Sequence, residues 1–344
     1  MVGGESHRGV ALLTALLVVA LVTIIAVGMI SRQQLDLRRT ANLLHSEQAW
    51  IYHLAVESHA APLIARYWDQ IEFVSLEQYR ELTALTGLGY QEEVDGGAIA
   101  VELVLDLEAG FNPNALLNQA NSVTERVTES ATGERESVGE SATPGGVDQL
   151  QMQILQRLLG YLQVDEAVAD SMLDWVDPDD IPGFAGAEDN YYLTLDPPYR
   201  AANAAMRHES ELRLLRGVDS DSYQRLLTLF RPLPGGSKIN VNWAGAELLM
   251  ALHEEIGMAE AQAIIEQRQM GGFQSVDAFT SFVKGLTSAA GVAREIPARL
   301  ISVSPAHFAV RTTVELDGMQ HRFQSLLKRD EKGAIGVLLR ERLG

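Results

Sequence analysis

Residues 10–30, VALLTALLVVALVTIIAVGMI, form an uninterrupted apolar run behind the short polar stretch MVGGESHRG. At about 1.5 Å per residue, a helix of this length spans roughly 30 Å, the thickness of the hydrocarbon core of a bilayer. No charged residue interrupts the run. A standard secretory signal is cleaved after its apolar run, whereas here Arg8 and Gly9 precede the run. The stretch therefore predicts a membrane-spanning N-terminal helix that stays on the protein after cleavage at the glycine.

The order of short leader, Gly9, apolar residue and long apolar helix resembles the prepilin class. The resemblance implies that a prepilin peptidase cleaves after Gly9, leaving Val10 as the mature N-terminus and a candidate for N-methylation. Thr14 is then the fifth mature residue, where most members carry a Glu that pairs with the terminal amine of a neighbouring subunit. A charge in apolar surroundings needs such a partner, so a chain without this Glu has nothing to offer a subunit assembled ahead of it. The alternative is an ordinary signal-anchor helix.

The composition limits the classes of function. The chain has 344 residues, enough for two or three domains, and its 46 acidic residues exceed its 27 basic ones by 19. Such an acidic chain repels nucleic acid as a whole and favours cations or basic partners. The absence of cysteine excludes disulfides, thiolate metal sites and thiol catalysis. More positive charges follow the apolar run than precede it, and this count disfavours a periplasmic location for the bulk of the chain. A periplasmic location is therefore expected from the prepilin resemblance and not from charge.

Residues at both ends of the chain predict one helix packed on a small antiparallel sheet. Apolar residues recur at helical spacing over 31–68, with Pro62 expected to end or kink the helix. Residues 98–107 alternate as a half-buried strand, with Leu107 on its apolar face, and 307–316 alternate in the same way. Asp317-Gly318 signals a hairpin to a return strand. A last strand, AIGVLLRE, carries Ile335, Val337 and Leu339.

About 190 residues separate the first predicted strand from the C-terminal strands, and their pattern predicts helices. Four segments place their leucines and other apolar residues at helical spacing: 150–162, 168–176, 212–215 and 223–230. Residues 121–146 lack apolar periodicity and are rich in Ser, Thr, Glu and Gly, which predicts a disordered loop. The interruption predicts a mostly α-helical domain inserted between strands.

A loop in this inserted part concentrates negative charge. Residues 174–199, DWVDPDDIPGFAGAEDNYYLTLDPPY, contain no Lys, Arg or His, and Pro178 and Pro182 keep the segment non-helical. Its first sixteen residues hold six carboxylates: Asp174, Asp177, Asp179, Asp180, Glu188 and Asp189. Aromatic residues, including Trp175, Phe184 and Tyr192, are expected to pin the loop to the fold. Crowded carboxylates repel one another, and Ca²⁺ relieves this in irregular all-oxygen loops.

The spacing leaves several interpretations of the loop open. With Asp177 as position one, Asp179 and Glu188 fall at positions three and twelve of an EF-hand loop, but Ile181 and Pro182 occupy places where that loop needs an oxygen ligand and Gly. The loop is therefore a distinct Ca²⁺ site or a solvated acidic loop. An acid/base pair of a Ca²⁺-dependent hydrolase is a third interpretation, but the sequence shows no sugar-binding constellation.

The motifs DWVDPDD, GAEDNYY and PPYRAAN resemble those of the K-type minor pseudopilins of the bacterial type II secretion system. The resemblance continues through SELRLL (Ser210–Leu215) and INVN (Ile239–Asn242), and includes the leader, the apolar helix and RQQLDLRRTANLLHSEQAW. It covers most of the chain, with 121–146 as the clearest departure. It implies an α+β, pilin-like fold, in which a long N-terminal helix lies on a small antiparallel sheet and a large helical domain is inserted between strands.

The same resemblance implies domain boundaries and a site. The expected segments are the leader 1–9, the membrane helix 10–30, a periplasmic helix and first strands 31–111, the inserted domain 112–297 and the C-terminal strands 298–344. The inserted domain is expected to bind one or two Ca²⁺ ions through Asp177, Asp179, Glu188 and Asp189, with Asp174 and Asp180 as weaker candidates. The implied role is non-enzymatic: a single-pass subunit of the inner membrane, its bulk in the periplasm, that caps or initiates the pseudopilus with the I- and J-type minor pseudopilins.

Residues 239–285 offer a competing function, because they resemble the helix-hairpin-helix modules of DNA-binding proteins. Gly257 marks the hairpin, and Arg268 lies on the expected second helix. In residues 240–285 only Arg268 and Lys284 are Lys or Arg, and acidic residues flank the hairpin. Phosphate would meet net repulsion there, so we expect no nucleic-acid partner and interpret the module as a protein-packing unit. The alternative is a membrane-anchored DNA-binding protein.

Overall fold

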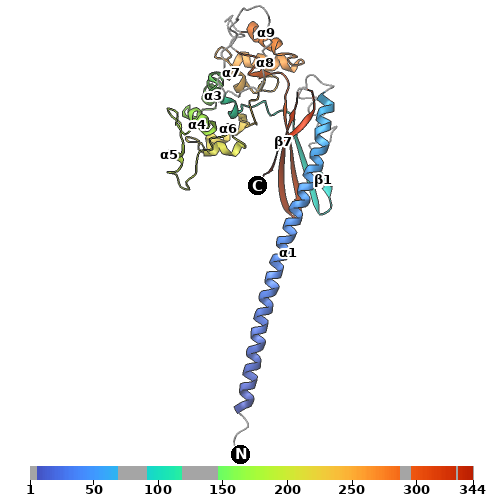
Figure 1. Cartoon of the computed structure of the whole chain (residues 1–344). Coiled ribbons are helices and arrows are strands. Elements are labelled where there is room, and N and C mark those ends of the chain that lie inside the picture. The colour runs from blue at the N-terminus through green and yellow to red at the C-terminus, as the bar shows by residue number, and fades with distance from the viewer. Residues whose placement is uncertain (1–5, 69–90, 118–145, 287–295, 331, 344) are drawn as a thin grey trace, which may run out of the picture.

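The computed structural model describes residues 6–68, 91–117, 146–286, 296–330 and 332–343, with side-chain surroundings from Leu12 onward. It has a long helix, an antiparallel sheet against the distal half of that helix, and a helical domain beside the sheet (Figure 1). This confirms the predicted α+β, pilin-like architecture with its inserted helical domain. The predicted loop 121–146 lies outside the described residues, except for Gly146.

The long helix α1 runs from Ser6 to Trp68 and passes through Pro62. Of the two expectations for this proline, that it ends the helix is wrong. Its first half projects away from the rest of the molecule (Figure 1). Among the described residues, the buried ones begin at Ala49. A fragment that starts at Arg32 therefore keeps every described residue of the cores.

Five strands form the sheet in the order β1-β2-β5-β6-β7, and all neighbouring strands are antiparallel. The strands are β1 (Gln91–Val94), β2 (Gly97–Val104), β5 (His307–Leu316), β6 (Met319–Arg329) and β7 (Ile335–Leu343). Their pairing joins β2 directly to β5 across the whole insertion. The Asp317-Gly318 hairpin is confirmed, because both residues have the positive φ angles that a tight hairpin turn requires.

Two details of the sheet differ from the alternation in the sequence. Strand β2 ends at Val104, so Leu107 lies in a small cluster with Leu326 rather than on the helix-facing side. A register shift in the β6–β7 pairing puts Leu339 in that same cluster, whereas Ile335 packs on the helix-facing side. A bulge adds one residue to a strand and moves the following side chains to the other face.

The face of α1 that contacts the sheet carries Ala49, His53, Glu57, Ala60 and Ile64 at helical spacing. Two of these residues are polar, and a hydrogen-bonded network satisfies them. His53 bonds Thr312 Oγ1 through Nδ1 and Ser325 Oγ through Nε2, both at 2.9 Å. Glu57 accepts bonds of 2.7 and 2.8 Å from the guanidinium of Arg340 and a short bond from the Ser325 hydroxyl. The network therefore ties α1 to β5, β6 and β7.

The helical domain has its own core, which extends in sequence from Phe111 to Ile301. Its elements are η1 (Pro113–Leu116), α3 (Gln149–Tyr161), α4 (Ala167–Val176), α5 (Asp189–Tyr192), η2 (Glu209–Leu214), α6 (Ser220–Leu229), β3 (Ile239–Asn240), α7 (Ala246–Ala251), α8 (Met258–Gln269), α9 (Val276–Leu286) and β4 (Ile301–Ser302). Strand β4 pairs with β3, so the helical domain extends past residue 297, where we expected it to end.

Candidate metal site in the acidic loop

The acidic loop follows α4, whose last turns hold it in place. Asp174 is 1% exposed, and its carboxylate accepts bonds of 3.1 and 3.0 Å from the backbone N–H of Gly183. Asp170 accepts a 2.9 Å bond from the N–H of Ala185. A Cβ on Gly186 would lie 1.9 Å from a carboxylate oxygen of Asp174, so only glycine fits at this position. Two aspartates of a helix thus fold the loop back against α4.

This folding brings three of the predicted ligands together. One carboxylate oxygen from each of Asp177, Asp179 and Glu188 lies within 4.8 Å of the others. Oxygen ligands bind Ca²⁺ at about 2.3–2.6 Å, so two ligands on opposite sides of one ion lie about 5 Å apart. The three carboxylates therefore have the separation that a shared cation requires.

The carboxylate of Glu188 gives the strongest indication that this loop is a cation site. The residue is 1% exposed, and neither carboxylate oxygen has a hydrogen-bond partner within the described residues. A buried oxygen of Asp177 is unpartnered in the same way. Burying charged oxygens without a partner is costly, and a bound cation removes that cost.

The titration of these groups follows from the same crowding. Burial, together with the charges of neighbouring aspartates, raises the pKa of Glu188 to about 7 and that of Asp177 to about 6. Burial also raises the pKa of Asp174. The site therefore disfavours its own negative charge near neutral pH when no cation is bound.

The other predicted ligands lie differently. The carboxylate of Asp189 faces away from the cluster, because it accepts a 3.0 Å bond from the N–H of Ala201 and forms a 3.2 Å ion pair with Arg200. Asp174 holds the loop through backbone N–H groups. Asp180 accepts a 2.9 Å bond from the side-chain amide of Asn203.

Asn203 is a candidate ligand that sequence reasoning missed. Its amide also donates to the backbone carbonyl of Asp179 at 2.8 Å, and its own side-chain oxygen is buried and unpartnered within the described chain. The residue adopts a φ of 43°, a left-handed conformation that Asn tolerates better than most residues. The PPYRAAN motif contains it, but nothing in the spacing of acidic residues pointed to an amide fourteen positions after Asp189.

The aromatic residues pin the loop only in part. Trp175 and Tyr192 are buried and lie 5.5 Å apart between ring centroids. Phe184 was expected to do the same, but it is fully exposed, as is much of Ile181. The backbone bonds at Gly183 and Ala185 hold the chain on both sides of Phe184, so its side chain points away from the core.

The helix-hairpin-helix-like segment is built as a packing unit. Gly257 caps the start of α8, and Ala261 and Ile264 on that helix are fully buried. Arg268 donates bonds of 3.2 and 2.7 Å to the carbonyls of Val241 and Ala244. Because this guanidinium already bonds backbone carbonyls, it is not presented to a phosphate.

The N-terminal features lie on α1. Gly9 and Val10 fall within the helix, and Thr14 lies four residues further along it. One helix among the described residues, Leu12–Arg66, is long and apolar enough to cross a membrane. An exposed apolar helix that leads into a small antiparallel sheet defines the class of pilin-like, membrane-anchored subunits.

Comparisons with known proteins place the chain within this class. Family profiles described as type II secretion system protein K match residues 109–234 and 239–303. Protein K of Pseudomonas aeruginosa is 35% identical over 98% of this chain and 93% of its own, and protein K of Aeromonas hydrophila is 29% identical over 96% of both. A chain in the crystal structure of the GspK-GspI-GspJ complex from enterotoxigenic Escherichia coli is 25% identical, with a TM-score of 0.68 over 89% of this chain and 99% of that chain.

The chain therefore belongs to the type II secretion system protein K family. It is a minor pseudopilin, and the DNA-binding alternative has no support from the relatives or from the surroundings of Arg268.

Proposed function

We propose that this minor pseudopilin is the first subunit of the pseudopilus, where it forms the tip together with I- and J-type minor pseudopilins. The position of the helical domain carries this proposal: it lies beside the sheet, at the end of the molecule away from the N-terminus (Figure 1). A further subunit stacked above would meet this domain. Thr14 supports the same position at the tip. A chain without a carboxylate at this residue does not need to pair with the N-terminal amine of a subunit assembled before it.

The partners bind along α1 outside the apolar run. Leu43, Leu44 and Ile51 are each more than 60% exposed on this helix, although the sheet already covers its other face. Large apolar side chains that remain exposed on a helix mark a surface for other helices. The neighbour that contains GspI and GspJ supports partners of the same kind for this chain. No enzymatic step is part of the proposed role.

Substituting Ile51 with Glu should weaken assembly with the I- and J-type subunits about tenfold or more, because it places a charge in a buried helix contact. The measurement is co-purification of the three proteins expressed together, with binding titrated on the purified subunits. Lys284→Glu changes an exposed position on α9, outside α1, and serves as the control. Undiminished binding by Ile51→Glu would exclude this face of α1 from the interface.

Prepilin processing also belongs to the proposal. The peptidase removes residues 1–9, the membrane helix then starts at Val10, and the sheet and helical domain lie in the periplasm. We expect mass spectrometry of the protein from its membrane to give Val10 as the first residue, and cells lacking the peptidase to keep residues 1–9. An N-terminus that is intact, or trimmed only of Met, would refute processing.

The proposed metal is Ca²⁺, bound by Asp177, Asp179 and Glu188 with the amide oxygen of Asn203. The unpartnered buried oxygens of Glu188 support it. When bound, the ion supplies positive charge that offsets the repulsion among the carboxylates. The residues themselves order the loop: Asp174 holds Gly183, and Asn203 connects the second half of the loop to Asp179.

A further inference from the structure

The helical domain and the sheet are joined over a small area. The chain crosses between them twice, through residues 105–110 after β2 and residues 303–306 before β5. Apolar contact between the two parts comes from one small cluster, made of Leu107, Leu233, Ala309 and Leu326. Trp243 adds a contact with the core between α1 and the sheet. Because the two large cores are separate, apolar burial alone fixes the angle between the parts only weakly.

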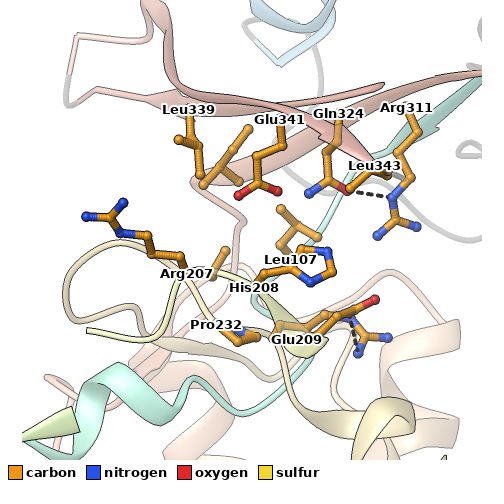
Figure 2. A pocket seen from close by; sticks show the side chains of 13 residues that line it. Leu107, Arg207, His208, Glu209, Pro232, Arg311, Gln324, Leu339, Glu341 and Leu343 are labelled. Carbon is orange, nitrogen blue, oxygen red and sulfur yellow. Dashed lines mark hydrogen bonds and ion pairs between the residues drawn. The ribbon is translucent and has the colours of Figure 1, made fainter. Parts of the chain in front are cut away.

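Open space lies beside this small contact. A cavity of about 230 Å³ separates the helical domain from the outer face of the sheet, which is the face opposite α1 (Figure 2). Glu341 lines it from β7, and Arg207 and His208 line it from the helical domain. A close-packed interface leaves no such space. The cavity therefore leaves room for one part to move against the other.

Polar contacts between the two parts gather at the crossing segments. Glu108 is buried, and its carboxylate bonds the N–H of Ala306 and Nδ1 of His307, both at 2.8 Å. The N–H of Leu107 donates to the carbonyl of His307 at 3.2 Å. These bonds hold the two crossing segments side by side, as the two chains of one hinge.

One side chain of the helical domain reaches across to the first crossing segment. Asn240 in β3 is fully buried, and its side-chain amide donates a 2.7 Å bond to the carboxylate of Asp106. Its amide oxygen accepts a 3.1 Å bond from the N–H of Asn242, which fixes the orientation of the amide group. Its backbone N–H donates to the carbonyl of Glu108 at 2.9 Å. Asn240 thus fastens the helical domain to the segment that leaves β2.

The carboxylate of Asp106 is arranged as an acceptor on both sides. One oxygen accepts from Asn240, and the other accepts from the N–H groups of Glu108 and Ala109 at 2.7 and 3.1 Å. Burial, together with the charge of Glu108, raises the pKa of Asp106 well above its usual range, although these three bonds oppose the effect. Three N–H donors suit an ionised carboxylate, so an amide at residue 106 would place a second NH₂ group against that of Asn240.

We propose that the helical domain is hinged on the sheet at the two crossing segments, and that the bond between Asp106 and Asn240 locks the hinge. With this bond formed, the domain keeps the position shown in Figure 1. Without it, the domain moves across the cavity while a few residues of the crossing segments absorb the change in backbone angles. The proposal rests neither on the place of the chain in the pseudopilus nor on the Ca²⁺ site.

The chain has no cysteine, so two nitroxide labels can be attached at introduced cysteines alone. Glu166→Cys in the helical domain and Glu315→Cys on the sheet are exposed positions. Double electron–electron resonance on the full chain in detergent micelles, at pH 8 to favour the ionised carboxylate, should give one narrow distance distribution. Asp106→Asn sets two donors against each other and Asn240→Asp sets two carboxylates against each other. Each should raise the population of displaced domains about tenfold.

The double variant Asp106→Asn with Asn240→Asp exchanges donor and acceptor, so it should restore the bond and the narrow distribution. A general loss of stability would not be rescued in this way. Asp219→Asn makes the same change at the cap of α6, away from the crossing segments, and should leave the distribution as in the parent. The proposal is overturned if the parent distribution is already broad, if both single variants keep the parent distribution, or if the double variant stays as broad as the single ones.

Discussion

Removing calcium from the residue 32–344 fragment should lower its melting temperature by roughly 5–10 °C. Binding to the folded form alone contributes about 2.7 kcal/mol when the free ion is at a hundred times its dissociation constant. For a domain of this size each kcal/mol shifts the melting temperature by about 2–4 °C. The physical origin is the cluster of Asp177, Asp179 and Glu188, which repel one another when no cation lies between them. Differential scanning calorimetry with calcium and with excess chelator measures the shift.

Substitutions at the neighbouring residues Glu188 and Asp189 provide a matched pair of variants. Glu188→Gln should lose the calcium shift, yet melt no lower than the parent chain in chelator, because it removes a charge that burial already disfavours. Asp189→Asn should keep the shift, because Arg200 and Ala201 hold that carboxylate outside the cluster. Identical melting curves with and without chelator in the parent chain would contradict the site.

Substituting Glu57 with Ala should destabilise the packing of α1 on the sheet by about 1–2 kcal/mol. Glu57 is buried and binds Arg340 through two hydrogen bonds, but the side chain of Arg340 is 44% exposed, so water can solvate the guanidinium that remains. His53 and Ser325 would lose part of their network at the same time. Hydrogen exchange should show faster opening of the α1 amides between residues 49 and 64. Glu47→Ala, on the exposed side of the same helix, is the control.

The same network predicts a dependence of stability on pH. Burial lowers the pKa of His53 from 6.5, with Glu57 opposing and Arg340 adding to this effect. Below pH 6.5 the unfolded chain therefore binds a proton that the folded chain does not, so the free energy of unfolding falls as the pH drops toward the lowered value.

Glu57 extends this loss of stability to lower pH. Burial raises its pKa, but the bonds from Arg340 and Ser325 outweigh burial and lower it below 4.5, so the stability it contributes is lost as the pH falls through that lowered value. Denaturant unfolding at pH 7.5 and 5.5 measures how much the free energy of unfolding falls with pH over the range in which His53 titrates. His53→Gln should reduce this fall, whereas His59→Gln, at an exposed position of the same helix, should not. An equal fall in both variants would rule out His53 as its source.

Local patterns accounted for most elements of the fold. The alternation of residues 307–316 and the Asp317-Gly318 pair predicted β5 and its hairpin, and helical spacing predicted α3, α4 and α6. Helical spacing also predicted a helix near Leu212, where the structure has the 3-10 turn η2. The short strand β1 was missed, because its sequence, QEEV, is polar and becomes a strand only by pairing with β2.

The apolar pattern of α1 predicted the helix but not the face that packs on the sheet. Leu43, Leu44 and Ile51 have the expected spacing and yet are exposed, while His53 and Glu57 are buried. A polar residue can occupy a core position only if distant residues bond it, and here those residues lie more than 250 positions away in β5, β6 and β7. No local pattern carries that information.

By itself, the sequence determined the long apolar N-terminal helix, the helix-on-sheet architecture with its insertion, and the loop in which carboxylates concentrate, because periodicity and composition are local properties. Only the tertiary structure decided which carboxylates converge, since α4 folds the loop so that Glu188 meets Asp177 while Asp189 turns to Arg200. It also brought the amide of Asn203 to Asp179 and Asp180, and it left a cavity between the sheet and the helical domain. Both depend on contacts between residues far apart in the chain, which are fixed only when the whole fold has formed.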